Sequence, residues 1–448
     1  MLSMPTWKPW IGFRDLSRTY GDVVYLEVLG RPIIVLGTPG VIMEFLDKRS
    51  AITSDRAESV LMELVGQENN FSFMSNDNRW RRQRRAFWQH FHPSVIPKYH
   101  QIQREATRKF LLRLLEAPER FQDIIHYVFS AAPMKAVYDL DLKDETDELI
   151  GVLESLTAGL RQATVSAQFL IEFIPLVARL PAWTPGTSFL RKLRASRAPS
   201  DRIMHDEFAN AKARVESGQD DSSIISQLLA SMGQASEPSS TASSEEEDTA
   251  KCVAAVAVEA GADTTFSTGE GFFLAMSLHP EVQEKARAEL DAIVGPHRLP
   301  DFEDRDALVY VNAIVKESLR WHNVVPLGVG HQTVEDTELH GYFIPAGTGI
   351  ISNVWAVLHD PDIYPEPDRF YPERFIRDGQ LDPDVLDPAS LVFGFGRRIC
   401  PGRHFADAML FIVIASVLHL FDIGPPRDDN GNPIKVKMEQ CHGFLSYV

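Results

Sequence analysis

Two short runs of β-branched and apolar residues stand out near the start of the chain, within residues 23–37 (VVYLEVLGRPIIVLG). They flank Gly30-Arg31-Pro32, and this arrangement predicts a β-hairpin. Thr38 and Pro39 follow as a typical helix start, so we expect a short helix over 39–48. Further short strands and turns are expected around 329–351, which gives the chain small β-rich regions rather than one large sheet.

Most of the remaining chain shows apolar residues at helical spacing. Successive amphipathic helices are expected from about 78 to 232, and one long helix from about 249 to 279. More helices reach residue 322, and a last long helix covers about 402–421. The pattern predicts a mainly α protein with small β-sheets.

Two segments interrupt these helices without marking a domain boundary. Residues 233–248 (GQASEPSSTASSEEED) are low in complexity and acidic, which predicts a mobile surface loop. Helical periodicity resumes on both sides of this loop. Residues 361–388 are rich in proline and irregular. There is no internal repeat, and we expect a single domain over 1–448.

Composition narrows the class of protein. The chain has 448 residues, of which 44% are hydrophobic and 24% charged, typical of a globular protein and not of a disordered, collagen-like or coiled-coil chain. The net charge of −17 excludes a global basic field for nucleic acid, and no nucleic-acid partner is expected. Three scattered cysteines exclude a disulfide framework and a Cys-rich zinc or iron–sulfur site.

The sequence shows no membrane-spanning segment, no signal peptide and no dinucleotide-binding fingerprint. The longest stretch without acidic or basic residues, 339–359, contains a proline and three glycines, and the apolar run 408–421 is short enough for a core helix. MLSMPTWKPW is not a signal peptide, and we expect no membrane anchor in this chain. Gly328-x-Gly330 and Gly394-x-Gly396 lack the third glycine of a dinucleotide fingerprint, so the chain shows no NAD(P) site of its own.

The strongest chemical signal is the decapeptide from Phe393 to Gly402 (FGFGRRICPG). Its glycines permit a tight turn and close approach of the backbone to a flat ligand. Cys400 stands just before a helix in which Pro401 is expected as the first residue, and the helix start favours a thiolate, which is a metal ligand. Arg398 can pair with a carboxylate of the same ligand.

This decapeptide resembles F-x-x-G-x-R-x-C-x-G, the haem-binding loop of the cytochrome P-450 superfamily, through Phe393, Gly396, Arg398, Cys400 and Gly402. The resemblance implies the cytochrome P-450 fold, with a helical part mainly at 78–322 and 400–421 and a β-rich part mainly at 20–60, 325–352 and 425–448. It implies that Cys400 is the axial ligand of a haem b iron and that Arg398 contacts a haem propionate.

Three further motifs follow the family order. Glu317 and Arg320 resemble its E-x-x-R, which implies a buried structural network with Arg374. Trp80 and Arg84 share a helical face and resemble its W-x-x-x-R, whose members contact a propionate; a basic solvated helix is the alternative. His331 stands where many relatives carry another propionate contact.

The hexapeptide Ala260–Thr265 (AGADTT) lies inside the long predicted helix. Small and β-branched residues gather on one face of this helix, so that face can lie close to a flat ligand. Gly261 costs about 1 kcal/mol in a helix interior, which suggests a role in packing or in opening the helix. A helix-packing stripe with a self-satisfied threonine is the alternative. The hexapeptide resembles the family's [AG]-G-x-[DE]-T-[ST], which implies that Asp263 and Thr264 deliver protons to iron-bound dioxygen.

The runs FGFGRRICPGRHFA and AVLHDP resemble those of fungal microsomal members, including members of secondary metabolism. The resemblance implies a haem-thiolate monooxygenase. It would insert one atom of O2 into a lipophilic small molecule, as a monomer on the cytoplasmic face of the endoplasmic reticulum membrane. Electrons would come from an NADPH-cytochrome reductase, a flavoprotein. It would dock on some of six arginines: Arg79, Arg81, Arg82, Arg397, Arg398 and Arg403. The alternatives are an isomerase or dehydratase acting without reductase, and an inactive haem-binding remnant.

Overall fold

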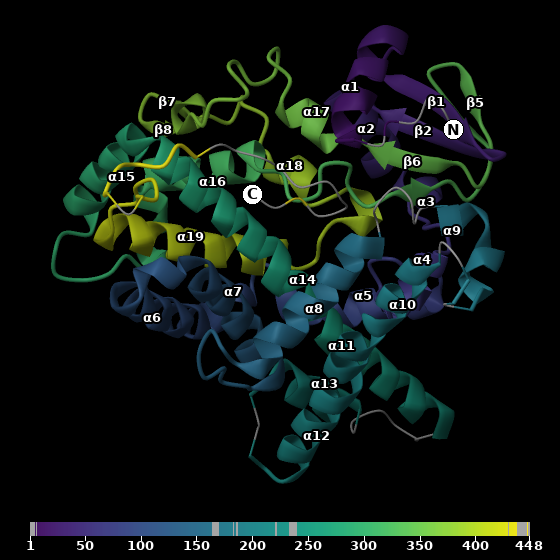
Figure 1. The fold of residues 1–448 in the computed structure, drawn as a ribbon, viewed down its shortest axis with the longest axis horizontal. Helices are drawn as coiled ribbons and strands as arrows, with labels where there is room; N and C mark the ends of the chain where they lie inside the picture. Colours follow the sequence, from purple (N-terminus) through teal and green to yellow (C-terminus); the bar gives the residue numbers. More distant parts are fainter. Residues whose placement is uncertain are drawn as a thin grey trace.

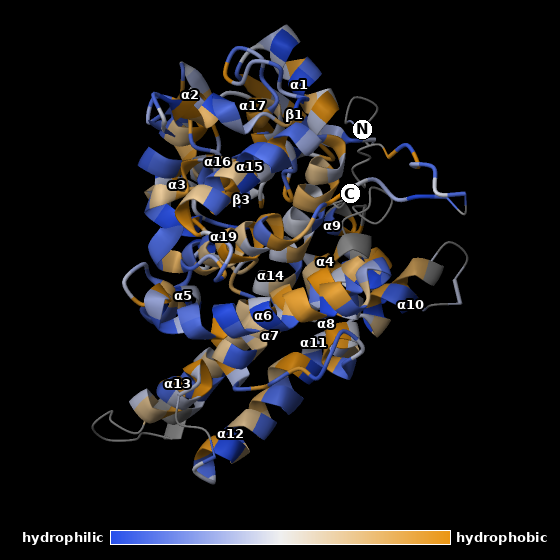
Figure 2. Ribbon diagram, turned by 90° about the vertical axis from the view of Figure 1, so that its left-hand side faces the viewer, coloured by the Kyte–Doolittle hydropathy of each residue, from blue (hydrophilic) through white to orange (hydrophobic). Residues whose placement is uncertain are grey.

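The computed structural model describes residues 5, 7–163, 170–181, 183–184, 187–219, 222–232, 240–428, 430–436 and 446. A small sheet and its neighbouring helices form one end of the molecule, and α12 and α13 form the other (Figures 1 and 2). The main helices lie between these ends. The N-terminal helices are α1 (Pro9–Tyr20), α2 (Pro39–Ile42), α3 (Ser50–Thr53), α4 (Val60–Leu64), α5 (Asn78–Phe91), α6 (His100–Glu116), α7 (Phe121–Tyr138) and α8 (Glu148–Ala163).

The remaining helices complete the helical part. They are α9 (Leu170–Phe173), α10 (Ser188–Ala195), α11 (Arg197–Asp201), α12 (Phe208–Glu216), α13 (Ile224–Met232), α14 (Ser240–Leu278), α15 (Pro280–Ile293), α16 (Val309–Trp321), α17 (Val354–Leu358), α18 (Ala389–Val392) and α19 (Arg403–Leu420). Short 3-10 or π turns, η1 to η8, join several of them: Met43–Lys48, Ile96–Tyr99, Pro118–Arg120, Pro175–Arg179, Arg202–Glu207, Phe302–Ala307, Pro372–Phe375 and Gly396–Arg398.

The main sheet joins segments that are far apart in the sequence. β1 (Val23–Val28) and β2 (Arg31–Leu36) form the predicted antiparallel hairpin, and β2 runs parallel to β6 (Gly349–Ser352). β3 (His331–Gln332) pairs antiparallel with β6 and forms the other edge of the sheet. The hairpin turns at Leu29 and Gly30, both with positive φ, a backbone that suits the twist of the two strands. Two further two-stranded sheets are formed by β4 (Thr337–Leu339) with β5 (Tyr342–Ile344) and by β7 (Ile376–Arg377) with β8 (Gln380–Leu381).

The helical core is built around α14, which passes through the middle of the molecule beside α7 and α19 (Figure 1). α7 and α19 are buried along most of their length. Figure 2 shows hydrophobic and hydrophilic residues alternating along the helices, as expected when each helix has one inward side. Apolar side chains of α5, α7, α14, α16 and α19 therefore share one core.

The predicted acidic loop is wrong for residues 240–248, because α14 begins at Ser240 instead of about 249. The acidic residues are held by cations of other elements: Asp248 pairs with Arg79 at 2.9 Å and Glu245 with Arg82 at 3.2 Å. Glu247 pairs with Lys212 at 2.8 Å. Residues 233–239 lie outside the described part of the chain.

Two smaller points concern the β-rich part, one near each end of the chain. The predicted helix over 39–48 is divided into α2 and the π turn η1, and Thr38 makes no capping bond with its side chain. In the described part of 425–448, Arg427 and Pro433 form an isolated bridge. Residues 429, 437–445, 447 and 448 belong to the expected β-rich part at 425–448 and lie outside the described residues.

Candidate functional site

The loop that carries Cys400 is shaped by two glycines with positive φ. Gly394 has φ 75° and Gly396 has φ 51°, and a Cβ on Gly396 would lie 2.5 Å from the Ser50 Cβ. No side chain fits at 396, so glycine is required there. The backbone N–H of Cys400 donates to the Phe393 carbonyl at 2.6 Å, which closes the loop on itself.

Helix α19 begins at Arg403, with Gly402 as its N-cap, and not at Pro401 as the sequence suggested. The backbone N–H groups of Gly402 and Arg403 and the guanidinium groups of Arg84 and Arg403 lower the pKa of the Cys400 thiol, but burial outweighs them and raises it. The N–H groups at the helix start therefore act in the expected direction, but in the protein alone they do not outweigh burial. A metal cation bound at the sulfur would supply the charge that a thiolate needs.

Arg398 is buried and lies inside the protein rather than on its surface. Its guanidinium donates to the carbonyls of Ser54 at 2.7 Å, Phe71 at 3.2 Å and Met74 at 2.8 Å. It also lies 4.2 Å from the ring centre of Trp80, within cation–π distance. The side chain links the Cys400 loop to the segment before α5.

Several buried cations gather beside Arg398. Arg56 is buried and donates to the carbonyls of Ser72, Val329 and Gly330, and burial together with Arg398 and Arg84 lowers its pKa well below the usual value. Burial lowers the pKa of Arg398 and of Arg84 to about 10. Asp55 and Asp77 are the carboxylates that act in the other direction on this group, so a ligand with carboxylates of its own would stabilise it.

Two predicted contact residues take different places around this cluster. Arg84 donates to the Ile399 carbonyl, next to Cys400. His331 is buried, its Nδ1 lies 2.8 Å from the Thr53 carbonyl, and burial with nearby Arg56 and Arg398 lowers its pKa well below the usual value. The sequence did not reveal Arg56, which belongs to no motif and is brought here by its contacts with the loop before β3.

The middle of α14 has an accessible stretch within an otherwise buried helix. Ala260 is exposed, and Gly261 and Thr264 are partly exposed, whereas Val253 and Ala257, which lie earlier in the same helix, are buried. The Thr264 hydroxyl donates to the Ala260 carbonyl at 2.7 Å. A Cβ at Gly261 would meet only the Pro133 Cβ, at 3.9 Å, so packing does not require glycine there.

Asp263 does not share the accessible stretch with Thr264. Its carboxylate is buried and faces α7, where its Oδ1 lies 3.7 Å from Nε2 of His126. The two residues of the predicted acid–alcohol pair therefore occupy different sides of α14, because adjacent helix residues are rotated by about 100°.

The structure brings Glu317, Arg320 and Arg374 together. Glu317 and Arg320 are fully buried and form two bonds, at 2.7 and 2.8 Å, and Arg374 reaches the same carboxylate at 3.2 Å. The N–H of Tyr371 donates to Glu317 at 2.8 Å, and Arg320 donates to the Leu358 carbonyl at 2.9 Å. The carboxylate and its partners thereby link α16 to the segment that precedes the Cys400 loop.

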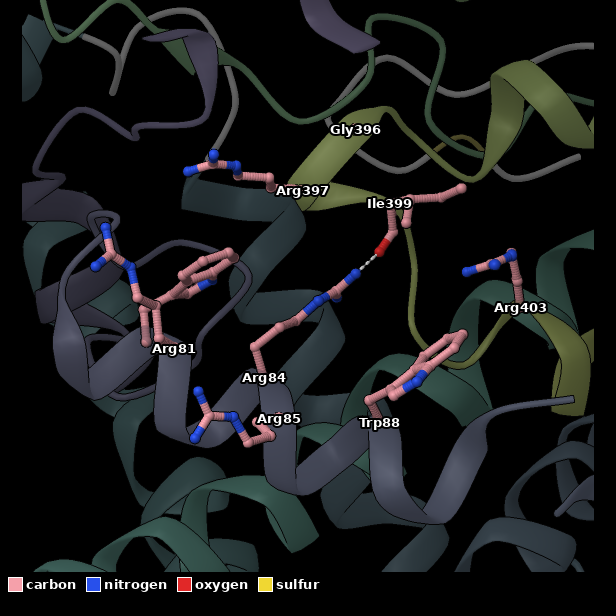
Figure 3. A pocket seen from close by; sticks show the side chains of 9 residues that line it. Arg81, Arg84, Arg85, Trp88, Gly396, Arg397, Ile399 and Arg403 are labelled. Atoms are coloured by element: carbon pink, nitrogen blue, oxygen red, sulfur yellow. Dashed lines mark hydrogen bonds between the residues drawn. The ribbon is translucent and has the colours of Figure 1, made fainter. Parts of the chain in front are cut away.

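Next to Cys400, a basic pocket of about 390 Å³ opens on the surface (Figure 3). Its walls come from α5 on one side and the 396–403 segment on the other. The lining residues are Trp80, Arg81, Arg84, Arg85, Trp88, Gly396, Arg397, Ile399 and Arg403. In the described chain, none of these five arginines forms an ion pair with a carboxylate, whereas Arg79 and Arg82 are bound to α14.

These observations fit a flat group that contains a metal and carries carboxylates. Cys400 offers a sulfur ligand in a glycine-shaped turn, buried arginines gather nearby, and α14 presents an accessible stretch of small residues. The described residues contain no cluster of three or more His, Cys, Asp or Glu that could hold a metal by itself. A single thiolate ligand is what haem requires from one side of its iron.

Comparison with known proteins agrees with this fit. The family model "Cytochrome P450" matches residues 2–445, and the chain belongs to the cytochrome P450 family. It is 38% identical, over 98% of this chain and 83% of the relative, to "Cytochrome P450 monooxygenase COX2" of Coprinopsis cinerea. It is 35% identical, over 100% of this chain and 88% of the relative, to "Tryptamine 4-monooxygenase" of Psilocybe cyanescens.

Solved structures agree on the fold. A zebra fish cytochrome P450 with progesterone is similar, with a TM-score of 0.80, 23% identity and coverage of 98% of this chain and 97% of that one.

The family model and the relatives identify the chain as a haem enzyme of the cytochrome P450 monooxygenase class, an oxidoreductase that incorporates oxygen from O2. Enzymes of this family generally draw electrons from a redox partner.

Proposed function

We propose that the chain inserts one atom of O2 into a lipophilic small molecule, with haem b held by Cys400 and electrons from an external NADPH-dependent reductase. The observation that carries this proposal is the placement of Cys400 in a glycine-shaped turn beside the buried cations Arg56, Arg84 and Arg398. When bound, haem supplies the redox chemistry that activates O2, and a thiolate ligand favours O–O cleavage.

The protein residues orient the group and supply protons. Arg398, Arg56 and Trp80 would hold the propionate side, with His331 behind them. Thr264, whose hydroxyl lies on the accessible stretch of α14, would hold a water molecule near the reacting oxygen. Asp263 on the other side of the helix would pass protons inward, because proton transfer needs a group that can both accept and release them.

The reductase is proposed to dock on the basic pocket of Figure 3. The docking face expected from the sequence needs a correction. Arg398 is buried, and Arg79 and Arg82 are held by carboxylates of α14. Arg81, Arg85, Arg397 and Arg403 remain available for an acidic partner, and association through them should weaken as salt rises.

The proposed location is the cytoplasmic face of the endoplasmic reticulum membrane. Exposed apolar side chains follow one another after α9: Ile174, Leu176, Leu180 and Trp183, the last 82% exposed. Side chains of this kind suit a membrane interface. Among the described residues, α19 alone is long and apolar enough to cross a membrane, and most of it is buried in the protein core.

The decisive experiment supplies purified holoenzyme with reductase, NADPH, candidate lipophilic substrates and ¹⁸O2. One ¹⁸O atom per product and stoichiometric use of NADPH are expected. Product formation without reductase, with no ¹⁸O, would support an isomerase or dehydratase instead. A protein that binds haem but forms no product from any of the substrates and consumes no NADPH would be a haem-binding remnant.

A further inference from the structure

A buried histidine lies behind Asp263. His126, on α7, is 3% exposed, and its ring contacts Phe266 edge to face at 4.6 Å between ring centres. Neither ring nitrogen has a hydrogen-bond partner within the described part of the chain. A buried imidazole without hydrogen bonds is costly, since burying a polar group without a partner disfavours folding.

Each nitrogen of this ring faces a carboxylate from a different helix. Nε2 lies 3.7 Å from Oδ1 of Asp263 on α14, and Nδ1 lies 3.6 Å from Oε1 of Glu154 on α8. The Asp263 side chain is 8% exposed, whereas the Glu154 side chain is 57% exposed. The three residues therefore form a line from solvent to the buried acid, and a movement of about 0.5 Å at each gap brings it into hydrogen-bond range.

We propose that His126 is a proton-relay residue that carries protons from Glu154 at the surface to Asp263. Glu154 takes a proton from water and gives it to Nδ1 of His126. Nε2 then releases its own proton to the Asp263 carboxylate. The electron pairs stay on the heteroatoms, and no oxidant or reductant is needed. Rotation of the ring, or the reverse transfer, restores the starting tautomer.

The imidazole suits this role because its two nitrogens can accept and donate at opposite ends of one ring. An amide of similar size can hold both carboxylates but cannot pass a proton through itself. His126 does not touch the reacting atoms, so it acts through Asp263. The inference rests on the proposed role of Asp263 in the monooxygenase reaction.

The first test measures contact and not activity. In holoenzyme labelled with ¹⁵N-histidine and held as the diamagnetic ferrous carbon monoxide complex, His126→Gln identifies the resonances of His126. Asp263→Asn should then move the Nε2 resonance, and Glu154→Gln the Nδ1 resonance. Glu148→Gln is the matched control, because Glu148 is on the same helix, exposed and paired with Arg202 instead. If neither nitrogen responds to its carboxylate, the line does not exist in solution and the proposal fails.

The second test separates a relay from a simple charge contact. His126→Gln should slow coupled turnover about tenfold and raise the solvent deuterium isotope effect, whereas Glu148→Gln should change neither. The double variant His126→Gln/Asp263→Asn should be no slower than Asp263→Asn alone, since both act on one step. A lower melting temperature with an unchanged isotope effect would make His126 a structural contact and overturn the relay.

The outcomes also separate this inference from the function on which it rests. If Asp263→Asn slows turnover and His126→Gln does not, protons reach Asp263 by another route and only the relay is wrong. If Asp263→Asn leaves turnover and its isotope effect unchanged, the proposed role of Asp263 is wrong.

Discussion

Arg79 on α5 and Asp248 on α14 form an ion pair of 2.9 Å that joins two helices 169 positions apart in the chain. The pair fixes the start of α14, and it also occupies an arginine that would otherwise face a partner protein. Arg82 and Glu245 repeat the arrangement at 3.2 Å. Contacts with the acidic segment near the start of α14 therefore decide which of these arginines are left without an ion pair.

The first prediction concerns this surface. Arg81→Glu and Arg397→Glu should each slow electron transfer from the reductase severalfold at low salt, because they place negative charge in the basic pocket. Substrate-induced spectral shifts should stay the same. Arg108→Glu on α6, an exposed cation outside the pocket, is the control. Stopped-flow reduction rates measure the effect, and equal rates for all three variants would exclude this face.

The second prediction concerns the sulfur ligand. Cys400→Ser should abolish the red-shifted band of the reduced carbon monoxide complex, because serine cannot provide the thiolate. Cys252→Ala should keep the band, since Cys252 is buried in α14 and burial raises the pKa of its thiol to about 12. Difference spectra of the two purified variants give the answer. A Cys400→Ser protein that retains the band would show that another residue holds the iron.

The third prediction compares two neighbouring threonines. Thr264 and Thr265 each donate to a carbonyl one turn earlier, at 2.7 and 2.8 Å, but only Thr264 belongs to the accessible stretch. Thr264→Ala should keep haem and NADPH consumption while product falls and hydrogen peroxide rises. Thr265→Ala should lose about 1 kcal/mol of stability and keep its coupling.

Product, peroxide and NADPH measured together decide between these results. Unchanged coupling in Thr264→Ala, with a stability loss like that of Thr265→Ala, would make Thr264 a packing residue. It would also revive the isomerase alternative.

The fourth prediction concerns the buried carboxylate of Glu317. Glu317→Gln should lower the free energy of unfolding by about 3–5 kcal/mol, because two buried arginines lose their counter-charge. Asp123→Asn removes an exposed carboxylate that pairs with Arg120 and should cost less than about 1 kcal/mol. Denaturant unfolding of both variants measures the difference. Equal losses would contradict the buried network.

The fifth prediction concerns pH. Glu259 on α14 is buried, accepts a bond from Gln67 at 3.1 Å, and burial raises its pKa to about 8. Between pH of about 4.5 and 8 the folded state keeps a proton that the unfolded state has released, so stability falls as pH rises. The loss, about 5 kcal/mol at most, is complete above pH 8.

Glu259→Gln replaces the titrating carboxyl group with an amide. It should flatten the fall of the melting temperature between pH 5 and 8, measured by calorimetry. Glu338→Gln, a change at an exposed position of β4, should leave the profile unaltered. An unaltered profile in Glu259→Gln would show that the carboxylate is ionised in the folded protein.

The sequence by itself determined the features that depend on local spacing. The hairpin follows from two β-rich runs around a turn, and the shape of the Cys400 loop from glycines whose φ other residues rarely adopt. Glu317 and Arg320 are three positions apart on a helix and had to be neighbours. The roles expected for these residues came from the resemblance to the cytochrome P450 family, whose motifs are short and contiguous.

Only the tertiary structure decided the features that depend on charges brought from distant segments. Arg56 belongs to no motif. It lies close to Arg398 and Arg84 because its guanidinium donates to backbone carbonyls of other loops. The acidic segment at 240–248 has the composition of a loop but is helical, because cations of α5 and α12 pair with it. His126 meets Asp263 and Glu154 only because α7 packs against both α14 and α8. Local composition cannot encode such contacts, since each depends on which helices pack together.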